Sequence, residues 1–415
     1  MPFLCFVYFV AYLDRVNVGF AALTMNADLA LTATQFGFGA GIFFISYFLF
    51  EVPSNFALKR FGARVWIARI MVTWGLISVA MAFVKGPTSF LVLRFLLGVA
   101  EAGFFPGMVL YLTFWFPNSV RAALFGIFII ANPASTIIGA PLSTALLGTS
   151  LGGFAGWQTM FIVEGLPAIL LGFATLFVLC DSPAKAKWLT PQEREVLGRA
   201  IERDEAGSTH SSWRAGLMSP DVWRFALLYA ALMMGVYGFG FWAPQIVKSF
   251  GTLNNQQVGF VLVIPYICAT VAMVLWSRHS DRTRERTWHL VIPAIVGTVG
   301  FLYGSFADNV YLAIGGFTLG AIGIYSQLPL FWTLPTALLT GSAAAGGIAL
   351  INSIGNLSGY FGPALIGWLK DTTQSYTAGL LVIAASMGFA GLLGYFISKP
   401  MSKWRRFERH GAGGA

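Results

Sequence analysis

Long apolar segments follow one another along almost the whole chain. A helix needs about 20 apolar residues to cross the hydrocarbon core of a bilayer. Only 10% of the residues are charged, against about 25% in soluble domains, so the chain has too little polar surface for a soluble globule. We expect an all-α membrane protein with twelve transmembrane helices near 3–27, 35–58, 65–84, 88–115, 121–148, 157–180, 222–249, 256–277, 288–306, 309–337, 343–369 and 376–398.

The net charge is +9, and most of the basic residues lie in the connections between the expected spans. Of the 26 Lys and Arg residues, 21 lie at or near alternate connections and the C-terminal end, whereas the opposite connections hold only Lys85, Lys248 and Lys370. The positive-inside rule then places the basic connections and both termini in the cytoplasm. Because the charge follows this alternation, we expect no nucleic-acid partner.

The longest polar stretch, 181–220, divides the expected spans six and six. It contains a Thr-Pro start signal at Thr190 and Pro191, followed by a charge-rich amphipathic pattern. We therefore expect an N-terminal six-helix bundle over 1–180 and a cytoplasmic linker with an amphipathic helix over 181–220. A C-terminal six-helix bundle over 221–398 and a cytoplasmic tail over 399–415 follow.

One gap-free offset of 222 residues relates the two halves. It places "RFLLG" (94–98) on "GFTLG" (316–320) and Arg60 on Arg282. It also places Pro141 on Pro363. Parallel six-helix repeats are typical of transporters, with the substrate near the midplane. The sequence therefore predicts two pseudo-repeat bundles.

Four charged residues lie deep inside expected spans, where a charge costs roughly 2.5–3.5 kcal/mol on insertion scales. They are Asp14, Arg15, Arg94 and Glu101. Their equivalents at the offset are uncharged, namely Val236, Tyr237, Gly316 and Gly323. We infer that the charged chemistry belongs to the N-terminal half alone.

Arg94 and Glu101 are seven residues apart and share one face of a helix. Gly98 lies between them and leaves room for a side chain or water. We interpret Glu101 as a proton site whose proton affinity Arg94 adjusts. Burial raises the pKa of a carboxyl group, whereas a nearby Arg lowers it. The alternative is a structural ion pair with another helix.

Asp14 and Arg15 point about 100° apart on their helix, so they need not pair with each other. Arg15 shares a face with Tyr12, and an Arg fork binds a carboxylate through two hydrogen bonds. We interpret Arg15 and Tyr12 as receivers of an anionic substrate and Asp14 as a proton carrier. The alternative is an Asp14–Arg bridge that only fixes packing.

Further polar and aromatic side chains inside the spans are candidates for the substrate site. Asn132 and Asn356 stand beside Gly/Pro-rich stretches that favour cavity-lining helices. Glu51 and Glu164 lie nearer span ends, and we expect them not to couple protons. The full substrate-binding prediction is Arg15, Tyr12, Tyr47, Asn132, Asn356, Trp332 and Gln245, with Asn352 as the alternative to Asn356.

These residues stand in stretches that resemble a known family. The stretches include "YLDRVNVGFAA", "FFISYFLFEVPSN", "RFLLGVAEAGFFPGM", "FWTLPTALLTG" and "ALINSIGNLSGYFGP". They are similar to the anion:cation symporter family of the major facilitator superfamily, in the branch of bacterial tartrate, phthalate and 4-hydroxyphenylacetate permeases. One departure is Lys59, which stands where the loop between spans two and three usually carries Asp.

The resemblance implies proton-driven import of a small organic anion by alternating access. Its proton-coupling acids would be Asp14 and Glu101, with Arg94 as modulator and Arg15 on the substrate carboxylate. It also implies a monomer in the bacterial inner membrane, with the proton as coupling ion and no other cofactor. Tartrate, a sugar acid or an aromatic carboxylate would be the substrate.

Three other function classes are weighed against this one. A drug or cation exporter would need an acidic, uncompensated cavity, whereas each deep acid here has a deep Arg nearby in sequence. An organic-anion exchanger without proton coupling would need paired Arg residues and no deep acid. An enzyme is not expected, because we find no HExxH, no GxSxG followed by suitable Asp and His, no His cluster and no Gly-Lys-Ser/Thr phosphate loop. The chain has only four His residues, and its three Cys residues are not spaced as metal ligands, so the sequence predicts no metal site.

Overall fold

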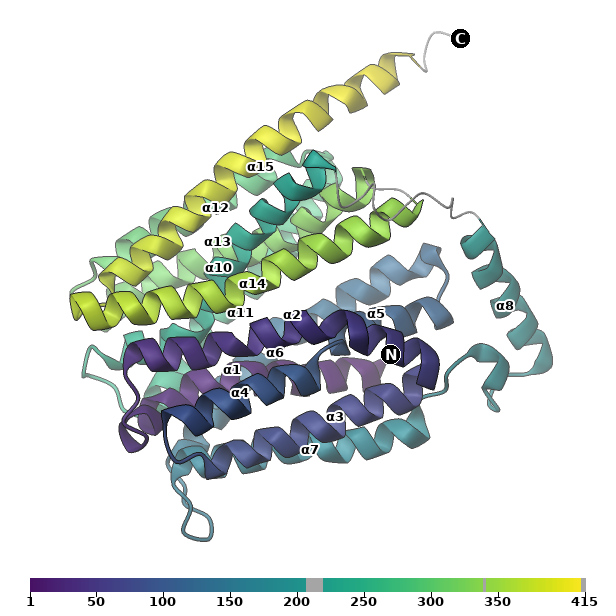
Figure 1. The fold of residues 1–415 in the computed structure, drawn as a ribbon. Coiled ribbons are helices and arrows are strands. Elements are labelled where there is room, and N and C mark those ends of the chain that lie inside the picture. Colours follow the sequence, from purple (N-terminus) through teal and green to yellow (C-terminus); the bar gives the residue numbers. More distant parts are fainter. Residues whose placement is uncertain (207–218, 339–340, 412–415) are drawn as a thin grey trace. The chain divides into compact units, whose positions relative to one another are not determined.

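The computed structural model describes residues 1–206, 219–338 and 341–411, and every regular element in these ranges is helical. The chain divides into two compact units, Met1–Thr209 and His210–Ala415 (Figure 1). We call them the N unit and the C unit. The all-α fold predicted from the apolar periodicity is confirmed.

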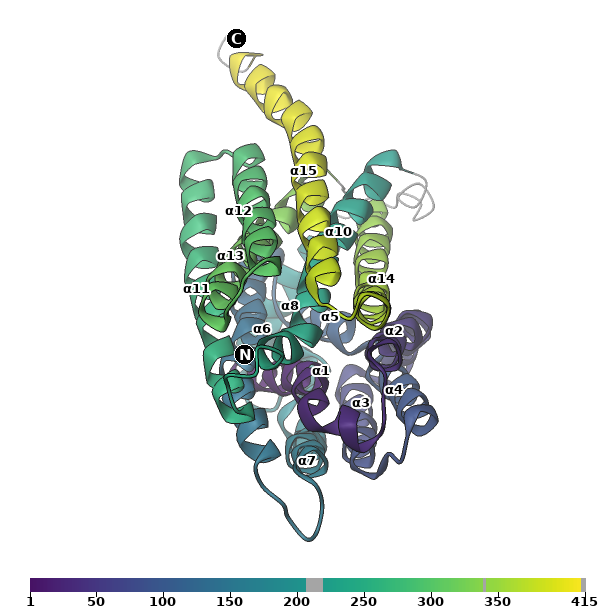
Figure 2. The same cartoon turned by 90° about the vertical axis from the view of Figure 1, so that its left-hand side faces the viewer.

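In the N unit the helices pack in pairs. α3 lies along α7, α2 along α4, and α1 along α6 (Figures 1 and 2). The elements are α1 (Pro2–Asp28), α2 (Ala33–Phe61), α3 (Ala63–Ala80), η1 (Met81–Phe83), α4 (Pro87–Glu101), α5 (Phe104–Trp115), α6 (Asn118–Leu147), α7 (Gly156–Val178), η2 (Pro183–Lys185) and α8 (Pro191–Ala206).

In the C unit, α12 lies along both α13 and α15, and α10 lies along α14. α15 continues as a helix to Gly411, so the segment predicted as a tail from residue 399 begins inside this helix. The elements are α10 (Pro220–Lys248), α11 (Asn255–Thr283), α12 (Thr287–Ser305), α13 (Val310–Leu338), α14 (Gly341–Thr373) and α15 (Thr377–Gly411).

Within the described residues, ten helical segments are long and apolar enough to cross a membrane. The α4 and α5 helices together form one of these segments, Pro87–Trp115. The two remaining predicted spans, 121–148 and 343–369, fall on α6 and α14. Part of the side chains of these two helices lie outside the described residues. A helix is thus present at each of the twelve predicted positions.

The offset of 222 residues reappears in the helix bounds. Adding it to the bounds of α2 gives those of α11. The start of each helix carries the same capping box: Thr32 with Gln35 in α2, and Asn254 with Gln257 in α11. A capping box satisfies backbone N–H groups that the first turn leaves unpaired. The repeat therefore extends to the chemistry of the helix ends.

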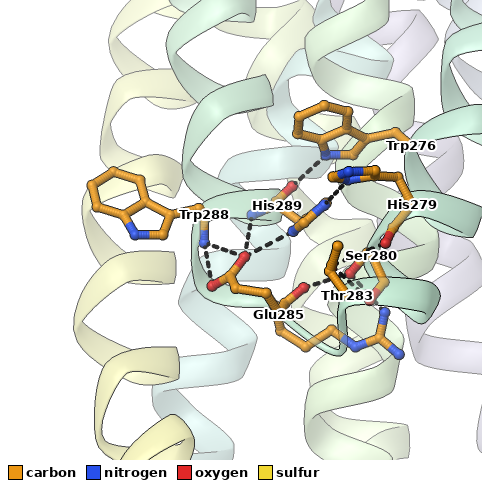
Figure 3. Close-up of polar contacts among 8 residues, drawn as sticks. Trp276, His279, Ser280, Thr283, Glu285, Trp288 and His289 are labelled. Atoms are coloured by element: carbon orange, nitrogen blue, oxygen red, sulfur yellow. Dashed lines mark hydrogen bonds and ion pairs between the residues drawn. The ribbon is translucent and has the colours of Figure 1, made fainter.

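The connection between α11 and α12 carries a polar cluster (Figure 3). The Glu285 carboxylate accepts hydrogen bonds from the Trp288 N–H at 2.9 Å and the His289 N–H at 3.2 Å, and contacts His289 Nδ1 at 2.7 Å. The other ring nitrogen of His289 lies 2.7 Å from His279 Nδ1. In neutral His289 the proton on Nδ1 faces Glu285, so Nε2 accepts from His279. This cluster caps α12.

Glu285→Gln is expected to destabilise the protein by about 1 kcal/mol at neutral pH, as loss of a helix cap does. Burial alone would raise the pKa of Glu285, but the hydrogen bonds from Trp288 and His289 lower it overall. Its stabilisation is therefore present above the unfolded-state pKa, about 4.3, and is lost as the pH falls through the lower folded-state value. Thermal unfolding in detergent across acidic pH measures this loss.

The matched control for this capping charge is Glu195→Gln, because Glu195 is an exposed residue of α8 that, among the described residues, forms an ion pair with Arg199 alone. Exposed pairs of this kind contribute about 0–1 kcal/mol. If Glu195→Gln and Glu285→Gln change the acid sensitivity of thermal unfolding equally, the assigned capping role of Glu285 is wrong.

Candidate functional site

The fourth predicted span is interrupted directly after Glu101. α4 ends at Glu101, and α5 begins at Phe104 after Gly103, which has a φ of +80°. A Cβ at position 103 would also lie 2.5 Å from Ser54 Oγ, so glycine is required for both conformation and space. The equivalent stretch of the C unit lies inside the continuous helix α13. The interruption places Glu101 at a helix end deep within the N unit.

Glu101 forms an ion pair with Arg15 across α4 and α1. The Arg15 guanidinium donates to Glu101 Oε1, and the side chains are 11% and 1% exposed. The second carboxyl oxygen, Oε2, is buried and has no hydrogen-bond partner among the described residues. Two buried charges stabilise each other only while both groups are ionised. Protonation of Glu101 would therefore remove the charge that holds the Arg15 guanidinium.

Three aromatic rings surround the Arg15 guanidinium. Its Cζ atom lies 5.4 Å from the ring centres of Tyr12, Phe43 and Tyr47. These distances are within the range of cation–π attraction. The rings hold the cation in an apolar environment, where a second carboxylate would bind strongly because little water competes.

Asp14 points to a different helix from Arg15. It is 1% exposed and accepts hydrogen bonds from Trp74 Nε1 at 2.6 Å, from Ser78 Oγ and from Asn17 Nδ2 at 3.3 Å. Its described partners are thus neutral donors of α3 and α1 rather than an Arg. The packing bridge that the sequence left open as an alternative for Asp14 is not formed in the described part of the chain.

Arg94 is buried, and its hydrogen bonds go to backbone carbonyls of α2. It donates from Nε to the Gly39 oxygen at 3.2 Å and from an Nη atom to the Ala40 oxygen at 3.0 Å. Its Cζ lies 5.0 Å from the Phe43 ring, on which Arg15 also packs. Phe43 therefore contacts both cations, while Glu101 forms its ion pair with Arg15.

The α2 helix fills the space that the sequence left open beside Gly98. A Cβ added to Gly98 would lie 2.1 Å from Ser46 Oγ and 2.2 Å from the Phe43 carbonyl oxygen. The expectation of room for a side chain or water there is wrong. The missing side chain instead allows α2 and α4 to approach closely, as small residues do in membrane helices.

Gly98→Ala is expected to destabilise the N unit by about 1–3 kcal/mol, the range for overpacking. The obstructing atom is a backbone oxygen, so the two helices must separate to admit the methyl group. Thermal unfolding in detergent measures the cost. The control is Gly315→Ala in α13, where a Cβ meets nothing within 4 Å. Equal stability of Gly98→Ala and the wild type would contradict this packing.

The other predicted binding residues are distributed between the two units. Tyr12, Arg15 and Tyr47 come together in the N unit, where Asn132 is half-buried on α6. In the C unit, Asn356 Oδ1 accepts a hydrogen bond from Tyr237 at 2.9 Å. Trp332 stacks edge-on against Tyr229 at 4.9 Å, and Gln245 is half-buried on α10.

Sequence reasoning missed four side chains that contact the deep charges, one of which is Asn17, three residues after Asp14 on α1. Phe43 lies one turn before Tyr47 on α2, so the i, i+4 spacing places both rings on one face. The same spacing relates Trp74 and Ser78 on α3, which both bind Asp14. Charge alone drew attention to the deep residues, whereas these partners show only as polar or aromatic pairs at helical spacing.

Comparison with known proteins gives consistent matches along nearly the whole chain. The family model described as "Major Facilitator Superfamily" matches residues 4–363. A protein of Agrobacterium vitis named "Putative tartrate transporter" is 52% identical over 406 residues, covering 97% of this chain and 90% of that protein. A protein of Acinetobacter baumannii named "Quinolone resistance transporter" is 42% identical, covering 96% and 92%.

A solved structure shows the same fold at low sequence identity. The crystal structure of a bacterial homologue of the human lysosomal transporter Spinster superposes with a TM-score of 0.76, at 17% identity and over 97% of both chains. These relatives are transporters rather than enzymes. The sequence and the fold thus point to a multi-pass membrane transporter of small organic substrates.

Proposed function

Because the chain belongs to the major facilitator superfamily, we propose that it is a proton-coupled symporter that imports a small organic anion by alternating access. The observation that carries this proposal is the buried Arg15–Glu101 pair within a ring of aromatic side chains. The same guanidinium can pair with Glu101 or with a substrate carboxylate. Competition between the two for one Arg couples proton binding to anion binding.

The coupling follows from charge balance. While Glu101 is ionised, it occupies Arg15 and excludes the anion. A proton on Glu101 Oε2, an oxygen without a hydrogen-bond partner among the described residues, cancels the charge of Glu101 and frees the guanidinium. The substrate carboxylate then takes its place, so the loaded site keeps the net charge of the empty site. This balance matters because an uncompensated charge makes occlusion costly.

Two further groups complete the mechanism. Asp14, held by neutral donors on α3, carries a second proton. Arg94 modulates Glu101 through its positive charge and through Phe43, which it shares with Arg15. Tyr12, Tyr47, Asn132, Asn356, Trp332 and Gln245 are proposed to contact the rest of the substrate.

The proposed substrate is a hydroxy or sugar acid such as tartrate, with an aromatic carboxylate as the alternative. The relative named for tartrate, at 52% identity, supports the first class. We propose the bacterial inner membrane as the location, with both termini cytoplasmic. We also propose that the protein acts as a monomer and that the proton is its coupling ion, with no other cofactor.

Uptake into proteoliposomes after a pH jump tests this function. A panel of labelled tartrate, a sugar acid, phthalate, hydroxyphenylacetate and a quinolone carboxylate is offered at equal and at lowered external pH. A symporter accumulates its substrate above the external concentration only when the outside is acidic. An exchanger without proton coupling instead requires substrate inside the vesicle and ignores the pH jump. Quinolone movement against the proton gradient would favour drug export, which the relative in Acinetobacter baumannii makes worth testing.

A further inference from the structure

Glu164 on α7 is a buried carboxyl that the mechanism above does not use. It is 1% exposed, although it lies near the end of a predicted span. Ser143 Oγ of α6 donates to Glu164 Oε1 at 2.7 Å. The other oxygen, Oε2, is buried without a hydrogen-bond partner, and no Lys or Arg pairs with Glu164 in the described part of the chain. An ionised carboxylate in such a place is costly.

Asn17 links Glu164 to Asp14. Its amide nitrogen donates to Asp14 Oδ1 at 3.3 Å, and its side chain lies close enough to Glu164 to act on that carboxyl group. The amide oxygen Oδ1 is buried and has no partner among the described residues. Two acceptor oxygens, on Asn17 and on Glu164, thus lack a donor in the same region. One proton on Glu164 Oε2 would satisfy both, since a carboxylic acid donates where a carboxylate only accepts.

We propose that Glu164 is a further proton-carrying residue of the transport cycle and that it shares one proton with Asp14 through the Asn17 amide. In the conformation described, Asp14 is the carboxylate that accepts from Trp74, Ser78 and Asn17, and Glu164 is the acid that donates to Asn17. Rotation of the amide exchanges its nitrogen and oxygen. It then donates to an ionised Glu164 and accepts from a protonated Asp14.

Asn17 does not itself relay the proton, which each carboxyl exchanges with water when the helices open. The amide determines only which of the two carboxyls holds it. α7 packs on α3, α1, α6 and η1. Among the described residues of these elements, Asp14 is the charged group that acts on Glu164. Since both groups are acids, their mutual repulsion favours a single negative charge on the pair.

This inference rests on the proposed proton coupling, so the first test does not use transport. Infrared spectroscopy of the purified protein detects the carbonyl stretch of a protonated carboxyl group. We expect Glu164→Gln to remove one such band at neutral pH, while Asp28→Asn, an exposed acid of α1, removes none. Persistence of every protonated-carboxyl band in Glu164→Gln would overturn the proposal. If that variant fails to fold, Ser143→Ala is used, and its lost hydrogen bond should shift the band.

The second test measures accumulation in proteoliposomes with a one-unit pH difference. Each coupled proton is then worth about tenfold in accumulation. Glu164→Gln and Asp14→Asn should each lower accumulation about tenfold, and the double variant should lower it no further, because the pair carries one proton. Unchanged accumulation by Glu164→Gln would make the residue a fixed hydrogen-bond donor and overturn the proposal. A hundred-fold loss of accumulation in the double variant would overturn the proposal that the two residues share one proton. If the wild type itself ignores the pH difference, the proposed function fails instead.

Discussion

Arg15→Gln is expected to lower the apparent affinity for the substrate anion by about ten- to a hundred-fold and so to abolish uptake at low substrate concentration. Hydrogen bonds to charged groups contribute about 1.5–3 kcal/mol, and about 1.4 kcal/mol corresponds to a factor of ten. The effect is large because the guanidinium lies among Tyr12, Phe43 and Tyr47, where little water competes. Binding of labelled substrate to the purified protein gives the affinity directly.

A double variant separates substrate binding from charge balance. Arg15→Gln leaves Glu101 without its cation, and breaking a buried pair is costly in itself. Arg15→Gln/Glu101→Gln removes both charges. If Arg15 receives the substrate, the double variant stays inactive although its thermal stability recovers. Recovery of uptake in the double variant would show that Arg15 serves only to balance Glu101.

The control for the loss of an arginine is Arg69→Gln. Arg69 lies on α3, where it packs on the Trp66 ring at 4.0 Å, and within the described part of the chain it forms no hydrogen bond or ion pair with a residue assigned to the site. We expect its substrate affinity to equal that of the wild type. An equal loss in Arg69→Gln would mean that uptake responds to the removal of any arginine from the N unit.

Asp14→Asn is expected to lower proton-driven accumulation about tenfold while leaving substrate exchange intact. The amide has nearly the shape of the carboxyl, and its oxygen can still accept a hydrogen bond from Trp74 or Ser78. What it loses is the ability to carry a proton. With a one-unit pH difference, one uncoupled proton lowers steady-state accumulation about tenfold. Accumulation and counterflow are measured on the same proteoliposome preparation.

Asp28→Asn is the matched control on the same helix. Asp28 also accepts a hydrogen bond from an indole, that of Trp157 at 2.7 Å, but it is exposed at the end of α1. We expect normal accumulation and normal counterflow. If Asp14→Asn accumulates the substrate as strongly as the wild type, Asp14 carries no coupled proton.

The deep charges were predictable because charged residues are costly, and therefore rare, in segments that cross lipid. Asp14, Arg15, Arg94 and Glu101 stand out against apolar neighbours, and the structure finds all four buried or nearly so. Their partners were not predictable. Arg94 shares a helix face with Glu101, yet Arg94 binds carbonyls of α2, and Glu101 pairs with Arg15, 86 residues away.

Glu164 illustrates the same limit. Its place near the end of an apolar segment led to the prediction that it does not couple protons, because distance along a helix was the available measure of depth. Burial depends instead on what the neighbouring helices cover. In the structure, Ser143 and Asn17 come from two other helices and enclose the carboxyl group. No spacing within one segment encodes that arrangement.

The sequence by itself determined the spans, the 222-residue repeat and the restriction of deep charge to one half. These are local properties: hydrophobic length, repeated capping boxes and residue type at each position. The tertiary structure decided the interruption after Glu101, the Arg15–Glu101 pair and the separate environment of Asp14. These features depend on which helices contact each other and on how each helix is rotated about its axis. Packing between distant segments determines the contacts and the rotation, as in the close approach of α2 to Gly98.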